Sequence, residues 1–347
     1  MTQTLFGPLP QSMDFRTASE DALFAYYRKA GFPNYNQADY SVTAELRKVR
    51  SADATAFFNG EKFKKYQAAN GFLFSYFPHW IDVQCGDSPT LREAWNDDAL
   101  LHSLLKKTRA FCDKHGEGWS TNRLRQNAKV YCAKQSVSNF NPVCARILYD
   151  RFASRGVVYD MSMGWGGRLL GFHASSARLY IGCEPSTKTF SGLRHLQADL
   201  SAITRKDAIL LPLGSEAVNL TAYTGQVDFA FTSPPYFDTE KYANEPTQSY
   251  IAFPTLERWL DGFLRPTIVR AAGVLRRGGV LAINYTNAPS VTIPLVRFAE
   301  DAGLRLESVL GYELSSIAGG GAKYEPIFVF RKGDDDGSTN QGQLSLF

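Results

Sequence analysis

From about residue 136 onward, short apolar runs alternate with longer stretches whose apolar residues recur at helical spacing. The apolar runs predict strands, and we expect helices between them. Strands that alternate with helices are typical of a mainly parallel sheet covered by helices. The predicted strands are 157–160, 178–183, 209–213, 227–231 and 280–285, followed by a terminal antiparallel hairpin of 304–312 and 324–331.

Residues 1–135 show a different pattern. Capping-box spacing at 17–20 and at 90–93 predicts two helix starts, the first helix running to Gly31 and the second to near Gly116. A further helix is predicted from about 120 to 132, whereas 32–90 gives no secure assignment. We therefore expect a mainly helical N-terminal region, 1–135, before an α/β domain at 136–332.

Composition narrows the class of protein. The 347 residues are 44% hydrophobic and 21% charged, which is typical of a soluble globular protein. Neither an apolar run long enough to cross a membrane nor a secretory signal is found, so we expect a cytoplasmic protein. The five cysteines are odd in number and never spaced as C-x-x-C, which predicts reduced thiols and no metal site.

Positive charge is concentrated in one stretch. The net charge is only +4, but 101–135 holds eight Lys and Arg residues against two acidic ones. Such a cluster suits a phosphate backbone, although a solvated helix face is the simpler interpretation. The candidate DNA contacts are Lys106, Lys107, Arg123, Arg125 and Lys129.

A glycine-rich turn follows the first predicted strand of the α/β domain. That strand ends at Asp160, and Ser162, Gly164 and Gly166 lie in the turn before the next helix. Glycine lets the backbone approach a ligand, and a helix N-terminus offers free N–H groups. Glu184 ends the next strand, twenty-four positions after Asp160, where an acid can accept both hydroxyls of a ribose.

The fourth predicted strand stops at two prolines, within the sequence Thr232-Ser233-Pro234-Pro235-Tyr236. Proline cannot donate to a sheet ladder, and each residue before a proline is held in extended backbone. The carbonyls of Ser233 and Pro234, the Ser233 hydroxyl and the Tyr236 ring would thus face a cleft. Acceptors beside a flat ring suit a planar heterocycle with an exocyclic amine. The simpler interpretation is a strand end with a core tyrosine.

In this order, the motifs resemble those of the DNA amino-methyltransferases, which transfer a methyl group from S-adenosylmethionine (AdoMet) to cytosine N4 or adenine N6. The resemblance covers about 139–332 and implies a Rossmann-like AdoMet-dependent methyltransferase fold with a seven-stranded mixed sheet whose last strand is reversed. It implies catalytic roles for Ser233, Pro234, Pro235 and Tyr236. The implied cofactor-binding residues are Asn141, Pro142, Asp160, Ser162, Gly164, Gly166, Glu184, Ser215, Glu216 and Thr232.

Two departures from the family stand out. The cofactor loop reads Asp-Met-Ser-Met-Gly-Trp-Gly-Gly-Arg where the family more often has Asp-Pro-Phe-x-Gly-x-Gly. The cofactor and catalytic motifs are only about seventy residues apart, which leaves no room between them for a target-recognition domain. We therefore assign target recognition to 1–135 and to the insertion 239–253.

The resemblance implies direct methyl transfer to a base flipped out of the DNA helix and stacked on Tyr236. Serine at position 233 slightly favours cytosine N4 over adenine N6. Two other classes stay open: an RNA or protein methyltransferase of the same fold, and a non-catalytic DNA-binding protein with a relict Rossmann domain.

The last fifteen residues form a third unit, 333–347. Its first ten residues contain no large apolar side chain, which predicts a flexible linker. The chain then ends in Gln343, Leu344, Ser345, Leu346 and Phe347, which resembles the motif that binds the bacterial DNA polymerase sliding clamp (beta subunit). The resemblance implies a bacterial or phage-infected cell, with the clamp and DNA as partners.

Overall fold

The computed structural model describes residues 14–15, 17–66, 69–132, 137–314 and 322–333. A central sheet of eight strands runs in the order β5–β4–β3–β6–β8–β10–β9–β1. The strands are β1 (Lys62–Phe63), β3 (Val157–Asp160), β4 (Leu179–Cys183), β5 (Asp207–Leu211), β6 (Val227–Thr232), β8 (Leu275–Asn284), β9 (Leu304–Glu313) and β10 (Tyr324–Lys332).

Strand direction identifies the fold. The five strands β5, β4, β3, β6 and β8 are parallel, whereas β10 is antiparallel to both β8 and β9. A reversed strand inserted next to the last parallel one is the arrangement expected of AdoMet-dependent methyltransferases, so the predicted Rossmann-like fold is confirmed. The predicted strand count was wrong by one, because β1 extends the edge beyond β9 with two residues only.

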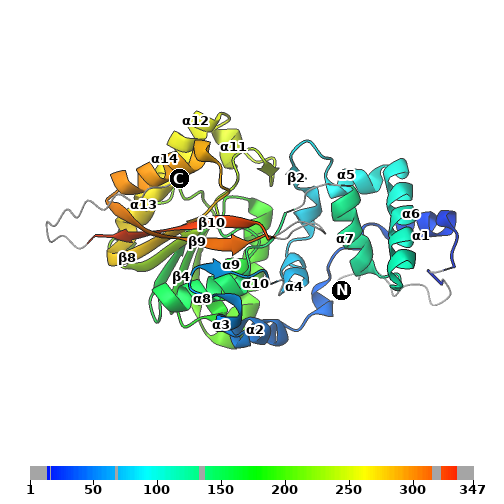
Figure 1. Ribbon diagram of the computed structural model, residues 1–347, viewed down its shortest axis with the longest axis horizontal. Coiled ribbons are helices and arrows are strands. Elements are labelled where there is room, and N and C mark those ends of the chain that lie inside the picture. The colour runs from blue at the N-terminus through cyan, green and yellow to red at the C-terminus, as the bar shows by residue number, and fades with distance from the viewer. Residues whose placement is uncertain (1–13, 16, 67–68, 133–136, 315–321, 334–347) are drawn as a thin grey trace.

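Helices cover both faces of the sheet. On one face lie α8 (Pro142–Phe152), α9 (Gly167–Ala174) and α10 (Thr187–Thr204); on the other lie α12 (Leu256–Trp259), a π-helical turn (Leu260–Leu264), α13 (Arg265–Val274) and α14 (Pro289–Asp301) (Figure 1). Successive strand residues point to opposite faces. Val158 accordingly packs in the core under α8, whereas Val157 and Tyr159 pack in the core under α13. Burial on both faces explains why the strands are almost continuously apolar.

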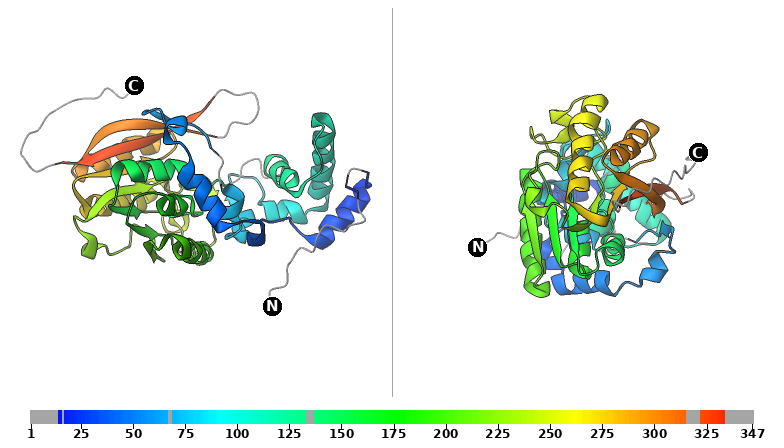
Figure 2. Two further views of the ribbon diagram at one scale, coloured as in Figure 1. Left: turned by 90° about the horizontal axis from the view of Figure 1, so that it is seen from below. Right: turned by 90° about the vertical axis from the view of Figure 1, so that its left-hand side faces the viewer.

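The N-terminal region is mainly helical, as predicted, and its outer helices extend away from the sheet (Figure 2). Its helix boundaries differ from the prediction at two points. Ser19, and not Thr17, caps the first helix, and Asp97 divides the expected long helix by capping a new start. The helices are α1 (Glu20–Ala30), α2 (Val42–Ser51), α3 (Ala54–Phe57), α4 (Asn70–Phe74), α5 (Leu91–Asn96), α6 (Asp98–His115) and α7 (Thr121–Tyr131), with short 3-10 turns at Gln37–Asp39 and Pro78–Asp82.

Part of this region packs directly on the sheet domain. Helix α2 lies against α8 and α9, and β1 pairs with β9. Buried side chains such as Leu23 and Phe77 belong to the same hydrophobic core as Leu169 and Phe229. The N-terminal helices and the sheet therefore share one continuous core along the α8–α10 face.

A two-stranded ribbon also joins the two parts of the chain. It pairs β2 (Gln84–Cys85) with β7 (Glu240–Lys241), which belongs to the insertion 239–253. The insertion continues into α11 (Ser249–Ala252) and is fixed to α10, because the Glu245 carboxylate accepts a hydrogen bond of 3.1 Å from the Thr187 backbone N–H. The ribbon places Glu240 beside the loops that follow β3, β4 and β6.

Candidate functional site

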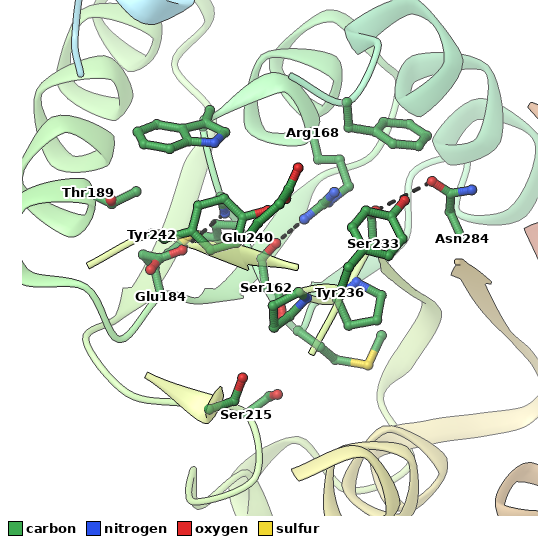
Figure 3. Close-up of a pocket in the computed structure, with 18 of the residues that line it drawn as sticks. Ser162, Arg168, Glu184, Thr189, Ser215, Ser233, Tyr236, Glu240, Tyr242 and Asn284 are labelled. Carbon is green, nitrogen blue, oxygen red and sulfur yellow. Dashed lines mark hydrogen bonds between the residues drawn. The ribbon is translucent and has the colours of Figure 1, made fainter. Parts of the chain in front are cut away.

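A cavity of about 290 Å³ opens where the parallel strands end (Figure 3). Its volume is near the lower end of the range for small-molecule sites, ~300–1,000 Å³. The loops after β3, β4 and β6 line it together, because the carboxyl ends of parallel strands meet at one edge of the sheet. The predicted site residues on its wall are Ser162, Gly164, Glu184, Ser215, Glu216, Ser233, Pro234, Pro235 and Tyr236.

Glycine is required in the loop after β3. Gly164 and Gly166 have φ of 56° and 80°, in the left-handed region that favours glycine. A Cβ on Gly166 would lie 2.5 Å from Cδ2 of Leu196, and one on Gly167 would lie 2.1 Å from the carbonyl oxygen of Phe140. The glycines thus allow the loop to turn tightly against α10 and the segment before α8.

Glu184 is held by the backbone at the end of β4. Its two carboxylate oxygens accept hydrogen bonds from the N–H of Gly164 (3.1 Å) and of Ser186 (3.0 Å). The side chain is buried, and this burial raises its pKa to about 7. A carboxylate on the cavity wall with unused lone pairs can accept the two hydroxyls of a ribose, as the sequence predicts.

Asp160 lies behind the cavity wall. It is fully buried and accepts hydrogen bonds from Nε of Arg168 (2.8 Å), the Tyr180 hydroxyl (2.6 Å) and the Ser162 N–H (3.1 Å). Arg168, and not Asp160, lines the cavity, and it also donates to the Ser162 carbonyl (Figure 3). Asp160 therefore shapes the loop through Arg168, a residue to which the sequence analysis gave no role.

Four other predicted cofactor residues also lie outside the cavity lining: Asn141, Pro142, Gly166 and Thr232. Asn141 is the N-cap of α8, and its side-chain oxygen accepts from the Val143 N–H at 2.8 Å, with Pro142 at the first helical position. Thr232 is buried at the end of β6, and its hydroxyl has no partner among the described residues. Contact of these four residues with a cofactor stays a prediction.

Four buried polar atoms of the described cavity lining have no hydrogen-bond partner: Oε2 of Glu216, Nε2 of Gln248, and Oδ1 and Nδ2 of Asn139. A buried polar atom without a partner is costly, so such atoms often mark a ligand. Of these, the Glu216 acceptor and the Gln248 donor suit the edge of an adenine, which presents an amine next to a ring nitrogen. Gln248, from the insertion 239–253, was missed by the sequence analysis. These atoms, the Glu184 carboxylate and the glycine loop fit AdoMet, the cofactor of this fold.

The Pro-Pro turn forms another part of the cavity wall. The Ser233 hydroxyl donates to Oδ1 of Asn284 (3.4 Å), and the Tyr236 hydroxyl donates to the Glu325 carboxylate (2.9 Å). The ring of Tyr236 lies 5.0 Å from that of Tyr285, tilted by 44°. Among the described residues, no backbone N–H donates to the carbonyl of Ser233 or of Pro234. The turn thus offers the carbonyls of Ser233 and Pro234 as acceptors beside the Tyr236 ring, which its hydroxyl bond holds in place.

Four further residues that line the cavity were missed by the sequence analysis: Glu240, Tyr242, Asn284 and Glu325. Asn284 ends β8, so the rule that strand ends carry site residues could have identified it. The other three come from the insertion and from the reversed strand β10. No local pattern indicates that these segments approach the cavity.

Within the described part of the basic run, 101–132, the five predicted DNA contacts do not form one exposed patch. Lys106 and Lys107 are exposed, whereas Arg123 pairs with Glu117. Arg125 donates to the Pro33 carbonyl at 2.8 Å, and Lys129 packs 4.5 Å from the Trp80 ring centre, where burial lowers its pKa to about 8. DNA contact by these residues stays a prediction, and much of their charge already serves internal contacts.

The remaining predictions concern absent features and the tail. All five cysteines are free and buried, and the described residues hold no group of His, Cys, Asp or Glu able to bind a metal ion. Within the described ranges, no helix is long and apolar enough to span a membrane. The clamp-motif residues Gln343, Leu344, Leu346 and Phe347 lie outside the described residues, so clamp binding stays a prediction.

No family model matches the chain, and no curated protein matches it. Solved structures of methyltransferases are similar at low identity. A SAM-dependent methyltransferase from Methanosarcina mazei is 11% identical over 54% of this chain and 97% of its own, with a TM-score of 0.38. TrmN from Thermus thermophilus is 17% identical over 55% of this chain and 48% of its own, with a TM-score of 0.40.

A third similar structure is M. jannaschii TYW2 in complex with AdoMet. It is 16% identical over 57% of this chain and 78% of its own, with a TM-score of 0.36. With TM-scores this low, the fold assignment depends on strand order and direction and not on these likenesses. By that order and direction, the chain has the Rossmann-like fold of AdoMet-dependent methyltransferases.

Proposed function

We propose that this protein is an AdoMet-dependent DNA methyltransferase that methylates the exocyclic amine of a flipped base, with cytosine N4 slightly favoured over adenine N6. One observation carries the proposal. The Ser233–Tyr236 turn and the Glu184 carboxylate, which are separate in sequence, line the same cavity (Figure 3). A ribose held at Glu184 and an amine held at Ser233 would therefore occupy the same cavity.

The turn is arranged to hold an aromatic amine. The Ser233 hydroxyl oxygen and the free carbonyl of Pro234 can accept the two N–H bonds of the amine, which turns its lone pair toward the cofactor side. Tyr236 offers a ring for stacking, worth ~1–3 kcal/mol per base. Bound AdoMet supplies an activated methyl group on a sulfonium. The protein's task is therefore mainly positioning, for which neither a metal nor a covalent protein nucleophile is required.

The choice of DNA as substrate is supported by the resemblance of the Ser-Pro-Pro-Tyr motif to that of the DNA amino-methyltransferases. Transfer of a labelled methyl group from AdoMet to unmodified plasmid DNA, total RNA and a protein extract tests it directly. We expect label in DNA that is removed by DNase and not by RNase. Label that RNase alone removes would replace DNA by RNA as the substrate, and absence of label with all three would contradict the enzyme assignment.

A further inference from the structure

Two carboxyl groups without an assigned role face the Pro-Pro turn. Glu240 comes from β7 and Glu325 from β10, and both line the cavity with Ser233 and Tyr236. Glu325 accepts a hydrogen bond of 2.9 Å from the Tyr236 hydroxyl. Oε2 of Glu240 accepts one from the Tyr242 hydroxyl, and Figure 3 labels both Glu240 and Tyr242. Arg168 is the one cation on the described cavity wall, and its Nε is bonded to Asp160. Among the described residues that line the cavity, no cation is therefore available to neutralise the two acids.

The surroundings of the two carboxyl groups differ. Burial raises the pKa of Glu325, but hydrogen bonds from the side chains of Tyr236 and Asn284 oppose this rise by favouring the ionised form. Burial, and then the negative charge of Glu325, raises the pKa of Glu240 to about 7. When their surroundings give two neighbouring carboxyl groups different pKa values, the group with the higher pKa keeps its proton and the other is the anion. Glu240 is the acid of this pair.

The groups around Glu240 do not offer it a positive charge. They come from five different segments and are acidic or neutral at pH 7: Glu325 on β10, Tyr236 after β6, Tyr285 after β8, Cys85 on β2 and Tyr242 in its own insertion. The Tyr242 hydroxyl donates to Oε2 of Glu240, and no described residue forms a hydrogen bond with Oε1. A proton on Oε1 is therefore free to be donated to a ligand.

An amino base needs such a donor. In cytosine and adenine, the exocyclic amine lies next to a ring nitrogen that only accepts hydrogen bonds: N3 of cytosine and N1 of adenine. The acceptors of the turn satisfy the amine but not this nitrogen. The donors of the turn and of Asn284 are already engaged, because the hydroxyls of Ser233 and Tyr236 donate to Asn284 and Glu325 and the Asn284 amide donates to the Pro326 carbonyl (3.1 Å).

We propose that Glu240, in its protonated form, donates a hydrogen bond from Oε1 to the ring nitrogen next to the amine of the target base. This inference depends on the proposed function, because it assumes that the amine is held at Ser233. It makes Glu240 a residue that selects cytosine or adenine by the ring acceptor. It also gives the insertion 239–253 a role in reading the base itself.

The pH dependence of two variants tests the proton. With AdoMet saturating, kcat/KM of the wild type should fall about tenfold per pH unit above the Glu240 transition, as the donor is lost. Glu240→Gln keeps an N–H donor and should show no such fall. Glu240→Ala should be roughly 10- to 100-fold slower than wild type below the transition. Glu257→Gln, an exposed acid on α12, is the matched control and should behave as wild type.

Substrate analogues test the contact. The probe is an oligonucleotide carrying the target base, as the natural base or as 3-deazacytosine or 1-deazaadenine, in which carbon replaces the ring nitrogen. The wild type should lose about as much rate on the analogue as Glu240→Ala loses on the natural base, and Glu240→Ala should not distinguish the two. Equal discrimination by both proteins would overturn the inference while the methyltransferase assignment stands. If the wild type methylates no oligonucleotide, both the role of Glu240 and the proposed function are overturned.

Discussion

The Tyr236 hydroxyl donates a hydrogen bond of 2.9 Å to the Glu325 carboxylate, across 89 positions of sequence. This bond fixes the one aromatic ring of the Pro-Pro turn from the reversed strand β10. A stacking platform must be held in place, because a mobile ring gives up part of its stacking energy on ordering. The methyltransferase sheet thus supports the candidate base site directly.

Two substitutions of Tyr236 should distinguish the contribution of its ring from that of its hydroxyl bond to Glu325. We expect Tyr236→Ala to weaken DNA substrate binding by ~1–3 kcal/mol through lost stacking. Tyr236→Phe keeps the ring and loses only the bond to Glu325, so its loss should be smaller, about 1 kcal/mol. The measurement is KM for the oligonucleotide, with the AdoMet dissociation constant as control for the cofactor side. If Tyr236→Ala has the wild-type KM and rate, the tyrosine is part of the core and not of the base site.

Glu184 predicts how cofactor affinity depends on pH. Ribose hydroxyls donate to the ionised carboxylate, and burial raises the pKa of Glu184 to about 7 in the free protein. Affinity for S-adenosylhomocysteine should therefore rise with pH up to about 7 and then level off. Without cofactor, the same raised pKa makes this group's contribution to stability fall as pH increases from 4.5 to about 7.

Calorimetric titration of S-adenosylhomocysteine over about pH 6 to 8 measures this effect. Glu184→Gln should bind ~1–3 kcal/mol more weakly and without pH dependence. The exposed Glu257→Gln variant should retain the wild-type curve. A wild-type curve in Glu184→Gln would remove this residue from the cofactor site.

The Asp160–Arg168 pair predicts a structural effect where the sequence suggested a ligand contact. Both side chains are buried, and loss of one partner of a buried pair costs ~3–5 kcal/mol. Asp160→Asn should therefore lower the free energy of unfolding by about that amount in chemical denaturation. The exposed pair Arg265–Asp261 provides the control, since Asp261→Asn should cost ~0.5 kcal/mol or less. Wild-type stability with lost cofactor binding would instead make Asp160 a direct ligand.

The sequence was sufficient for the parts of this fold that repeat a local pattern. Buried parallel strands are nearly continuous apolar runs, so the order of strands and helices and the position of Asp160, Glu184 and Ser233 at strand ends could be predicted. Strands of two residues leave no such pattern. The edge strand β1 and the β2–β7 ribbon were therefore not predicted, and with the ribbon Glu240 was missed.

The sequence also did not show which side chains pair with one another in the folded chain. Nothing near Asp160 in sequence shows that Arg168 occupies its carboxylate, and nothing near Lys129 shows that Phe74 and Trp80 cover its ammonium group. Charge counts treat each basic residue as free. In the folded chain, contacts between distant segments decide which charges remain for a ligand.

DNA binding should depend on the exposed basic residues and not on those that already make internal contacts. Lys106→Ala with Lys107→Ala should weaken binding to all sequences and reduce the salt dependence by roughly one unit per lost phosphate contact. Lys129→Met should leave the salt dependence unchanged, because its ammonium group is buried over the rings of Phe74 and Trp80, whereas Lys106 and Lys107 are exposed. Fluorescence anisotropy over a salt series measures both. An unchanged slope in the double variant would move the DNA-binding surface away from α6.

If the proposed function is right, the Ser233–Tyr236 turn presents a base amine to a methyl donor. The most direct test expresses the wild type and Ser233→Ala in a host without DNA methylation and determines modified bases in its DNA by single-molecule sequencing. We predict N4-methylcytosine, or N6-methyladenine, at a recurring sequence with the wild type, and a strong reduction with Ser233→Ala although the variant folds and binds AdoMet. Unmodified DNA with the wild type, or equal modification by both proteins, would contradict the account.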